Sequence, residues 1–141
     1  MGAKTPQALS ALHGQCFSEA PRPWTAQEFS ELLSAPGMVF VERDQGFALA
    51  RLIADEAELL TIAVAPQARG AGLGAAILAE VEADAARQGA KRMFLEVAED
   101  NTAATALYGA ANYKSAGYRK DYYRGDGRKT SALVMAKPLT P

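Results

Sequence analysis

A glycine-rich segment from residue 67 to residue 74 is the part of the sequence best suited to binding a ligand. Its sequence is Gln-Ala-Arg-Gly-Ala-Gly-Leu-Gly, and it lies between a predicted strand and a predicted helix. Alternate glycines let the backbone approach a ligand without Cβ clashes, and the free N–H groups at a helix start suit an anion such as pyrophosphate. Arg69 can add a positive charge. The spacing fits neither the dinucleotide-binding motif nor the P-loop, and a tight structural turn is the alternative interpretation.

Two further side chains could carry out proton transfer. Glu96 lies in a predicted strand among apolar neighbours, so we expect its side chain to be partly buried. Burial of a carboxylic acid raises its pKa toward the range that a general base needs to deprotonate an ammonium. Tyr108 lies on a predicted helix, where its phenol could protonate a departing thiolate. The alternatives are an edge glutamate paired with Lys91, Arg92 or another cation, and a tyrosine that only packs.

His13 and Cys16 are the only histidine and the only cysteine in the chain. Three residues apart on a predicted helix, they could touch as a nucleophile and its base, but such a site also needs an orienting group and an oxyanion hole. We therefore expect ordinary packing roles for both. One residue of each kind also provides neither a disulfide framework nor a Cys/His zinc site within one chain, so we expect no bound metal.

The pattern of apolar residues and capping signals predicts the elements that would position these groups. Thr25 and Glu28 form a capping box at the start of a short helix, and Gly89 ends a longer one. Tyr122 and Tyr123 fall in the predicted connection between the last two strands. We expect helices at 6–17, from 26 to before 36, 72–88 and 101–111, and strands at 38–43, 47–54, 58–64, 91–98, 113–119 and 131–137. This order predicts one α+β domain, residues 1–141, with a mixed sheet covered by helices on both sides.

Composition and charge disfavour several other classes of protein. The chain has 141 residues, of which 49% are hydrophobic, and a formal net charge of -1. The length suffices for one hydrophobic core, and a nucleic-acid-binding domain would usually be more basic. No segment approaches the length of a membrane span, and the first residues lack a signal-peptide pattern. We expect a cytoplasmic protein with no direct nucleic-acid partner and no membrane partner, either a monomer or a weak dimer.

The glycine-rich segment resembles the signature of the GNAT superfamily of N-acetyltransferases. Gln67, Gly70 and Gly72 match the pattern Q/R-x-x-G-x-G/A, and the flanking strand and helix lie where that family has them. The resemblance implies the GNAT fold, a mixed and mostly antiparallel sheet of about six to seven strands flanked by about four helices. It also implies acetyl-CoA as co-substrate, with the acetyl-pantetheine arm along the strand and the diphosphate on the glycine-rich amides. The implied acetyl-CoA-binding residues are Ile62, Ala63, Val64, Arg69, Gly70, Ala71, Gly72, Leu73, Gly74, Asn101 and Tyr108.

The second half of the chain resembles the RimI type within this superfamily. In that type, the residues that correspond to Glu96 and Tyr108 serve as general base and general acid. The sequence departs from the RimI pattern at Asn112, where glycine is usual, although asparagine tolerates a left-handed helix cap. It also has Lys129-Thr130-Ser131 where an acidic residue is usual, a departure that concerns the choice of acceptor more than the chemistry. The matching segments are Leu95-Glu96-Val97 followed by Asn101, Ala106-Leu107-Tyr108, Pro23-Trp24, Arg119-x-x-Tyr122-Tyr123, and Asp126-Gly127-Arg128 ahead of Val134-Met135.

The RimI resemblance implies acetylation of the α-amino group of a protein N-terminus by direct attack in a ternary complex. The implied partner is a peptide or protein terminus, in particular the N-terminal alanine of a small-subunit ribosomal protein. Trp24, Tyr122 and Tyr123 could line a groove for the first side chains of that peptide, because large amphipathic aromatics suit such a surface, but Trp24 could equally belong to the core. Acetylation of a small amine and a non-catalytic acetyl-CoA-binding subunit are the alternatives.

Overall fold

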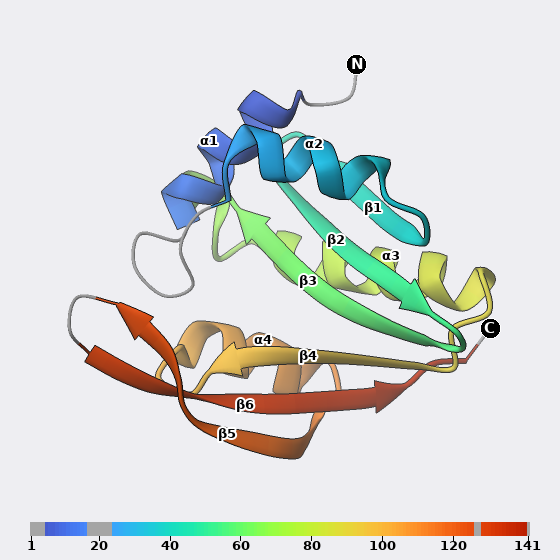
Figure 1. The fold of residues 1–141 in the computed structure, drawn as a ribbon, viewed down its shortest axis with the longest axis vertical. Helices are drawn as coiled ribbons and strands as arrows, with labels where there is room; N and C mark the ends of the chain where they lie inside the picture. The colour runs from blue at the N-terminus through green and yellow to red at the C-terminus, as the bar shows by residue number, and fades with distance from the viewer. Residues whose placement is uncertain (1–4, 17–23, 126–127, 141) are drawn as a thin grey trace.

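The computed structural model places one mixed sheet between helices on both of its faces (Figure 1). It describes residues 5–16, 24–125 and 128–140. Within these ranges the elements are α1 (Pro6–Cys16), α2 (Ala26–Ser34), β1 (Met38–Arg43), β2 (Gly46–Ile53), β3 (Glu56–Val64), the 3₁₀ helix η1 (Pro66–Ala68), α3 (Leu73–Arg87), β4 (Arg92–Ala98), α4 (Thr102–Ala110), β5 (Lys114–Gly125) and β6 (Arg128–Pro138). The predicted α+β fold, with six strands and four α-helices in the described ranges, is confirmed.

The strands lie in the order β1-β2-β3-β4-β6-β5, and β3 and β4 are the parallel neighbours in this sheet. Their pairing is short, because it joins Glu56–Glu58 of β3 to Arg92–Phe94 of β4 and then stops. Figure 1 shows the two strands together at one end of the sheet and well separated at the other. The sheet therefore consists of two antiparallel parts that join at one end and diverge toward the carboxyl ends of β3 and β4.

A β-bulge in β3 lies where this divergence begins. On β2, Leu49 is opposite Thr61 while the adjacent Ala50 is opposite Leu59, so Leu60 is an extra residue in β3. A bulge bends its strand and reverses which side chains face the core. Accordingly, Leu59 belongs to the core cluster beneath α3, whereas Ala63 belongs to the cluster beneath α1 and α2.

Two hydrophobic clusters hold the helices against the sheet, one on each face (Figure 1). In the larger cluster, Ile77, Val81 and Ala85 occur at helical spacing along α3 and are fully buried. In the smaller cluster, Phe29 of α2 packs against Phe47 of β2, with ring centroids 5.5 Å apart. Because each helix presents one apolar side, both faces of the part formed by β1, β2 and β3 are covered.

Several helices begin or end at the residues that the sequence predicts. The Thr25–Glu28 capping box is formed, with both reciprocal hydrogen bonds present. Gly89 follows α3 with a φ of 102°, and Asn112 follows α4 with a φ of 75°, so asparagine adopts the left-handed conformation at the position where glycine is usual. The helix predicted at 6–17 ends at Cys16 in the structure, and Phe17 lies outside the described residues.

The last two strands are longer than predicted. The structure extends β5 to Gly125 and begins β6 at Arg128, so Tyr122 and Tyr123 lie in a strand and the predicted connection over these residues is wrong. The register of β5 is irregular between Arg119 and Tyr123, which explains why period-2 alternation could not mark this stretch as a strand. None of the described helices is long and apolar enough to cross a membrane.

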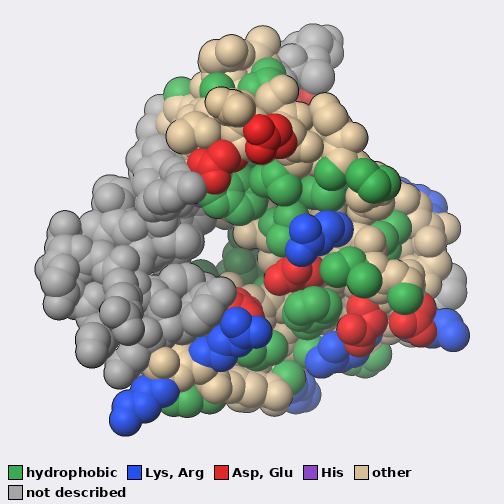
Figure 2. Space-filling model, viewed as in Figure 1, with side chains coloured by type: hydrophobic (Ala, Val, Ile, Leu, Met, Phe, Trp, Pro, Cys, Tyr) green, Lys and Arg blue, Asp and Glu red, His purple; other side chains and the backbone are tan. Residues whose placement is uncertain are grey.

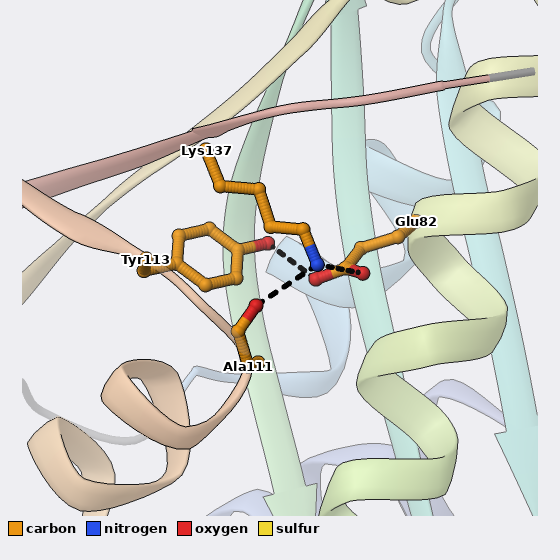
Figure 3. A network of polar contacts seen from close by, with 4 residues as sticks. All are labelled: Glu82, Ala111, Tyr113 and Lys137. Carbon is orange, nitrogen blue, oxygen red and sulfur yellow. Dashed lines mark hydrogen bonds and ion pairs between the residues drawn. The ribbon is translucent and has the colours of Figure 1, made fainter.

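A polar network joins α3 to the end of α4 and to β6 (Figure 3). Glu82 of α3 accepts a hydrogen bond from the Tyr113 phenol at 2.8 Å and forms an ion pair with Lys137 at 2.8 Å. Lys137 Nζ also donates to the Ala111 carbonyl oxygen at 2.9 Å. Burial, reinforced by the neighbouring Glu82 carboxylate, raises the pKa of Tyr113 far above its usual range, so the phenol remains a donor. These contacts link α3, which packs on β1, β2 and β3, to the part of the sheet that carries β6.

His13 is a buried structural histidine, as expected, and the side chain of Cys16 lies outside the described part of the chain. The Nδ1 atom of His13 accepts a hydrogen bond from the Trp24 N–H at 3.1 Å. The imidazole proton is therefore on Nε2, which donates to Thr61 Oγ1 at 3.0 Å. The Trp24 ring stacks on the imidazole at 4.9 Å. Burial lowers the pKa of His13 to about 4, although the Glu28 carboxylate acts in the opposite direction.

This depressed pKa predicts a loss of stability in mild acid. The unfolded chain takes up a proton at a histidine pKa near 6.5, whereas the folded protein resists protonation until about pH 4. The contribution of His13 to the free energy of unfolding is therefore fully present above pH 6.5 and declines as the pH falls toward 4. At pH 5 the free energy of unfolding is lower by on the order of 2 kcal/mol. Urea unfolding of the wild type and of His13→Asn should show a stability difference that narrows between pH 7 and pH 5. A constant difference would contradict this assignment.

Candidate active site

A cleft of about 430 Å³ opens where β3 and β4 diverge. In the orientation of Figure 2, the molecule is hollowed near its centre, between the part that carries β3 and the part that carries β4. The glycine-rich loop and the start of α3 form one end of the cleft, and α4 forms a wall. The lining residues are Ile62, Ala63, Val64, Ala68, Arg69, Gly70, Gly72, Leu73, Gly74, Ala75, Glu96, Val97, Ala98, Asn101, Ala103, Ala104, Leu107 and Tyr108.

The glycine-rich loop has the backbone that an anion site requires. Gly70 and Gly72 have φ values of 85° and 83°, in the left-handed region that glycine adopts without strain. Gly72 is the N-cap of α3, and no side chain caps this helix, so its first N–H groups are available to a bound anion. The Arg69 side chain donates to the Val64 carbonyl oxygen at 3.1 Å, which holds the loop against the end of β3.

Gly74 shows how closely a ligand could approach the start of α3. A Cβ at this position would lie 3.7 Å from Val64 Cγ2 and 3.7 Å from Leu107 Cδ2, within ordinary van der Waals contact. The missing side chain therefore leaves space between β3 and α4 that even alanine would fill. The absence of a Cβ at Gly74 lets a ligand in the cleft come close to the backbone at the start of α3.

The two strand edges that face the cleft suit an extended ligand. Beyond Glu58, β3 is paired with β2 alone, and beyond Phe94, β4 is paired with β6 alone in the described register. Backbone groups on the inner edges can therefore bond to a ligand inserted between the strands, much as a further strand would. Ile62 and Val64 lie on this part of β3.

Glu96 lies in the cleft, and its side chain is 19% exposed, so the predicted partial burial is observed. It forms an ion pair with Arg119 of β5, with 3.1 Å between Arg119 Nη2 and Glu96 Oε1. Arg92, a partner considered from the sequence, pairs with Glu56 at 2.9 Å. Sequence analysis did not identify Arg119 as a site residue, although Arg119 is the first residue of the segment that resembles the RimI type.

Tyr108 lies on the side of α4 that faces the cleft and is 7% exposed. Its ring packs edge-on against Tyr113, with the centroids 5.8 Å apart, so Tyr108 contributes both to the cleft wall and to the core. Asn101 fixes the start of α4, because its side chain accepts a hydrogen bond from the Ala104 N–H at 3.1 Å. The cleft thus brings together Glu96 of β4 and Tyr108 of α4, which are twelve positions apart in the sequence.

Four of the residues predicted for binding are placed differently from the rest. Ala71 is exposed and does not line the cleft. Trp24 is half-buried and packs with the cluster beneath α1 and α2, with its ring 5.3 Å from that of Phe29. Tyr122 and Tyr123 lie in β5, but their side chains are outside the described part of the chain. Among the described residues, no group of three or more His, Cys, Asp or Glu side chains could hold a metal ion.

The arrangement places a glycine-rich loop, an inter-strand opening, and a carboxylate and a phenol in a single cleft. The sequence profile described as the acetyltransferase (GNAT) family matches residues 7–113, which is most of the chain. This protein belongs to the GNAT family of acetyltransferases. It is accordingly an N-acetyltransferase, and the fold expected from that membership is the fold observed.

Relatives of this GNAT protein include bacterial enzymes that are named as N-acetyltransferases. It is 31% identical over 122 residues to the [ribosomal protein bS18]-alanine N-acetyltransferase of Escherichia coli strain K12, covering 84% of this chain and 82% of that one. It is 35% identical over 130 residues to the N-alpha-acetyltransferase RimI of Mycobacterium tuberculosis, covering 86% and 80%. The crystal structure of the Escherichia coli ribosomal-protein-S18-alanine N-acetyltransferase superposes with a TM-score of 0.84 at 25% identity, over 100% of this chain and 92% of that chain.

The space at Gly74 predicts how a single methyl group would affect ligand binding. Gly74→Ala places a Cβ in the cleft and should weaken acetyl-CoA binding about tenfold in calorimetry, or ~1.4 kcal/mol. The folded protein should not be destabilised, because alanine favours a helix over glycine by ~0.5–1 kcal/mol.

Gly109→Ala is the matched control. Gly109 lies in α4 outside the cleft lining, and a Cβ there would have nothing within 4 Å. It should gain similar stability while leaving acetyl-CoA affinity unchanged. Equal affinity of Gly74→Ala and wild type would show that the ligand does not pass through this space.

Proposed function

We propose that this GNAT enzyme transfers the acetyl group of acetyl-CoA to the α-amino group of a protein N-terminus. The observation that carries the proposal is that one cleft contains both the glycine-rich loop and the pair Glu96 and Tyr108. The loop amides would hold the diphosphate, and the inner edges of β3 and β4 would hold the pantetheine arm. This arrangement directs the acetyl thioester toward the carboxylate and the phenol.

The chemistry requires two proton transfers and no covalent acetyl-enzyme. As the amine nitrogen attacks the acetyl carbonyl carbon, Glu96 accepts a proton from the amine, directly or through a water molecule. The C–S bond then breaks, and Tyr108 donates its phenolic proton to the departing thiolate. A phenol suits this second step because it is a neutral donor at pH 7, and solvent can return its proton after release of the products.

The proposed acceptor is an α-amine, in particular the N-terminal alanine of a small-subunit ribosomal protein. An α-amine has a pKa near 7.7–8.0, against about 10.4 for a lysine side chain. Its ammonium form therefore gives up a proton to a carboxylate far more readily. The names of the similar bacterial enzymes support this acceptor. We further propose that residues 1–141 form one acetyltransferase domain that works in the cytoplasm as a monomer or weak dimer, without direct nucleic-acid or membrane partners.

A panel of acceptors tests the proposal directly. Acetyl-CoA consumption should be greatest with peptides that carry the N-terminal sequence of the ribosomal protein, and lower with internal-lysine peptides and small amines. Glu96→Gln and Tyr108→Phe should each lower kcat by about 10²-fold or more, the range typical of acid–base groups, while acetyl-CoA affinity stays near that of the wild type.

Each alternative has its own outcome in this panel. Preference for small amines would keep the chemistry but overturn the proposed acceptor. Acetyl-CoA binding without turnover of any amine would indicate a binding subunit instead of an enzyme. Full activity of Glu96→Gln would remove Glu96 as the base.

A further inference from the structure

The ion pair between Glu96 and Arg119 joins the cleft to the outer strand of the sheet. Glu96 lies on β4 with its side chain 19% exposed, whereas Arg119 lies on the edge strand β5 with its side chain 54% exposed. One partner therefore lines the cleft, and the other lies outside the cleft lining. The strand β6 lies between them, so the two side chains meet across a neighbouring strand.

The register of the sheet explains how they meet. Glu96 and Gly117 are both opposite Val134 of β6, so they share one face of the sheet. Arg119 is two residues beyond Gly117 in regular register and therefore shares that face too. Strands two apart in a sheet are separated by roughly 10 Å, which a long arginine and a glutamate can span together.

Small residues leave room for this crossing. Arg119 is opposite Ala132, and Gly117 has no side chain where a Cβ would lie 3.4 Å from Val134 Cβ. Regular pairing of β5 with β6 runs from Gly117 to Arg119, and the register shifts on either side of this stretch. The backbone that carries Arg119 is thus held by β6, up to the position from which its guanidinium reaches Glu96.

Stability alone is a poor explanation for this pair. More than half of the Arg119 side chain is exposed, and solvent screening leaves such pairs with little net contribution to folding. A guanidinium is, however, well suited to fixing the direction of a carboxylate, because it is planar and permanently charged. Arg119 engages Glu96 through Oε1, and a carboxylate has a second oxygen that can accept a proton.

We propose that Arg119 is a positioning residue, which holds the Glu96 carboxylate directed toward the acceptor amine. This inference rests on the proposed function, in which Glu96 accepts the proton of that amine. Arg119 acts through Glu96 and not through acetyl-CoA, because the glycine-rich loop lies at another part of the cleft lining and Arg119 is not among the lining residues. Its removal should therefore affect the chemical step and leave co-substrate binding intact.

The test combines single and double variants. Arg119→Gln removes the charge, Arg119→Lys retains it, and Lys120→Gln removes a charge from the next residue of β5, which is also exposed. We expect Arg119→Gln to lower kcat for the N-terminal peptide about tenfold, since small misplacements of a catalytic group have effects of this order. Arg119→Lys should recover much of the activity, Lys120→Gln should match the wild type, and acetyl-CoA affinity should stay unchanged in all three.

The double variant separates positioning from a merely structural role. If Arg119 acts through Glu96, adding Arg119→Gln to Glu96→Gln should lower kcat by less than about twofold further, because residues that act as a unit are not additive. A full tenfold further loss, or a parallel loss of acetyl-CoA binding, would overturn the proposal. Full activity of Arg119→Gln alongside an impaired Glu96→Gln would overturn the role of Arg119 alone. Full activity of Glu96→Gln itself would overturn the proposed base, and this inference with it.

Discussion

The short parallel pairing of β3 with β4 is the constraint on which the rest of the structure depends. The last joined residues are Glu58 and Phe94, and the bulge at Leu60 follows almost at once. Because a bulge bends its strand, β3 turns away from β4 beyond this point, and a sheet that would otherwise be continuous becomes a cleft. A continuous ladder would satisfy the inner backbone groups within the protein and leave no channel for a ligand.

Such an opening needs support from the surrounding elements. The larger hydrophobic cluster includes residues from both parts of the sheet, so the parts share one core even though their strands diverge. The contacts of Glu82 with Tyr113 and Lys137 add polar links between α3 and the part that carries β6. These contacts hold the elements beside the cleft, which presents Glu96 from a strand and Tyr108 from a helix.

Local signals in the sequence predicted much of this structure. The Thr25 capping box, the left-handed turn at Asn112 and the glycine-rich loop before α3 each follow from residue types at fixed spacing. The strand order could not be predicted in this way, because it depends on which strands pair across the whole chain. Sequence analysis therefore missed the meeting of Glu96 with Arg119 across β6, the bulge at Leu60 and the extension of β5 through an irregular register.

The central claim is that acetyl-CoA lies between the diverging strands with its diphosphate on the amides that precede and begin α3. Amide hydrogen exchange, measured residue by residue with and without acetyl-CoA, tests this claim most directly. The account predicts slower exchange at residues 62–64 and 69–75 on binding, and no change in β1, the edge strand of the β1–β2 hairpin, which β2 separates from β3. Binding that leaves residues 69–75 unprotected, or that protects β1 instead, would contradict it.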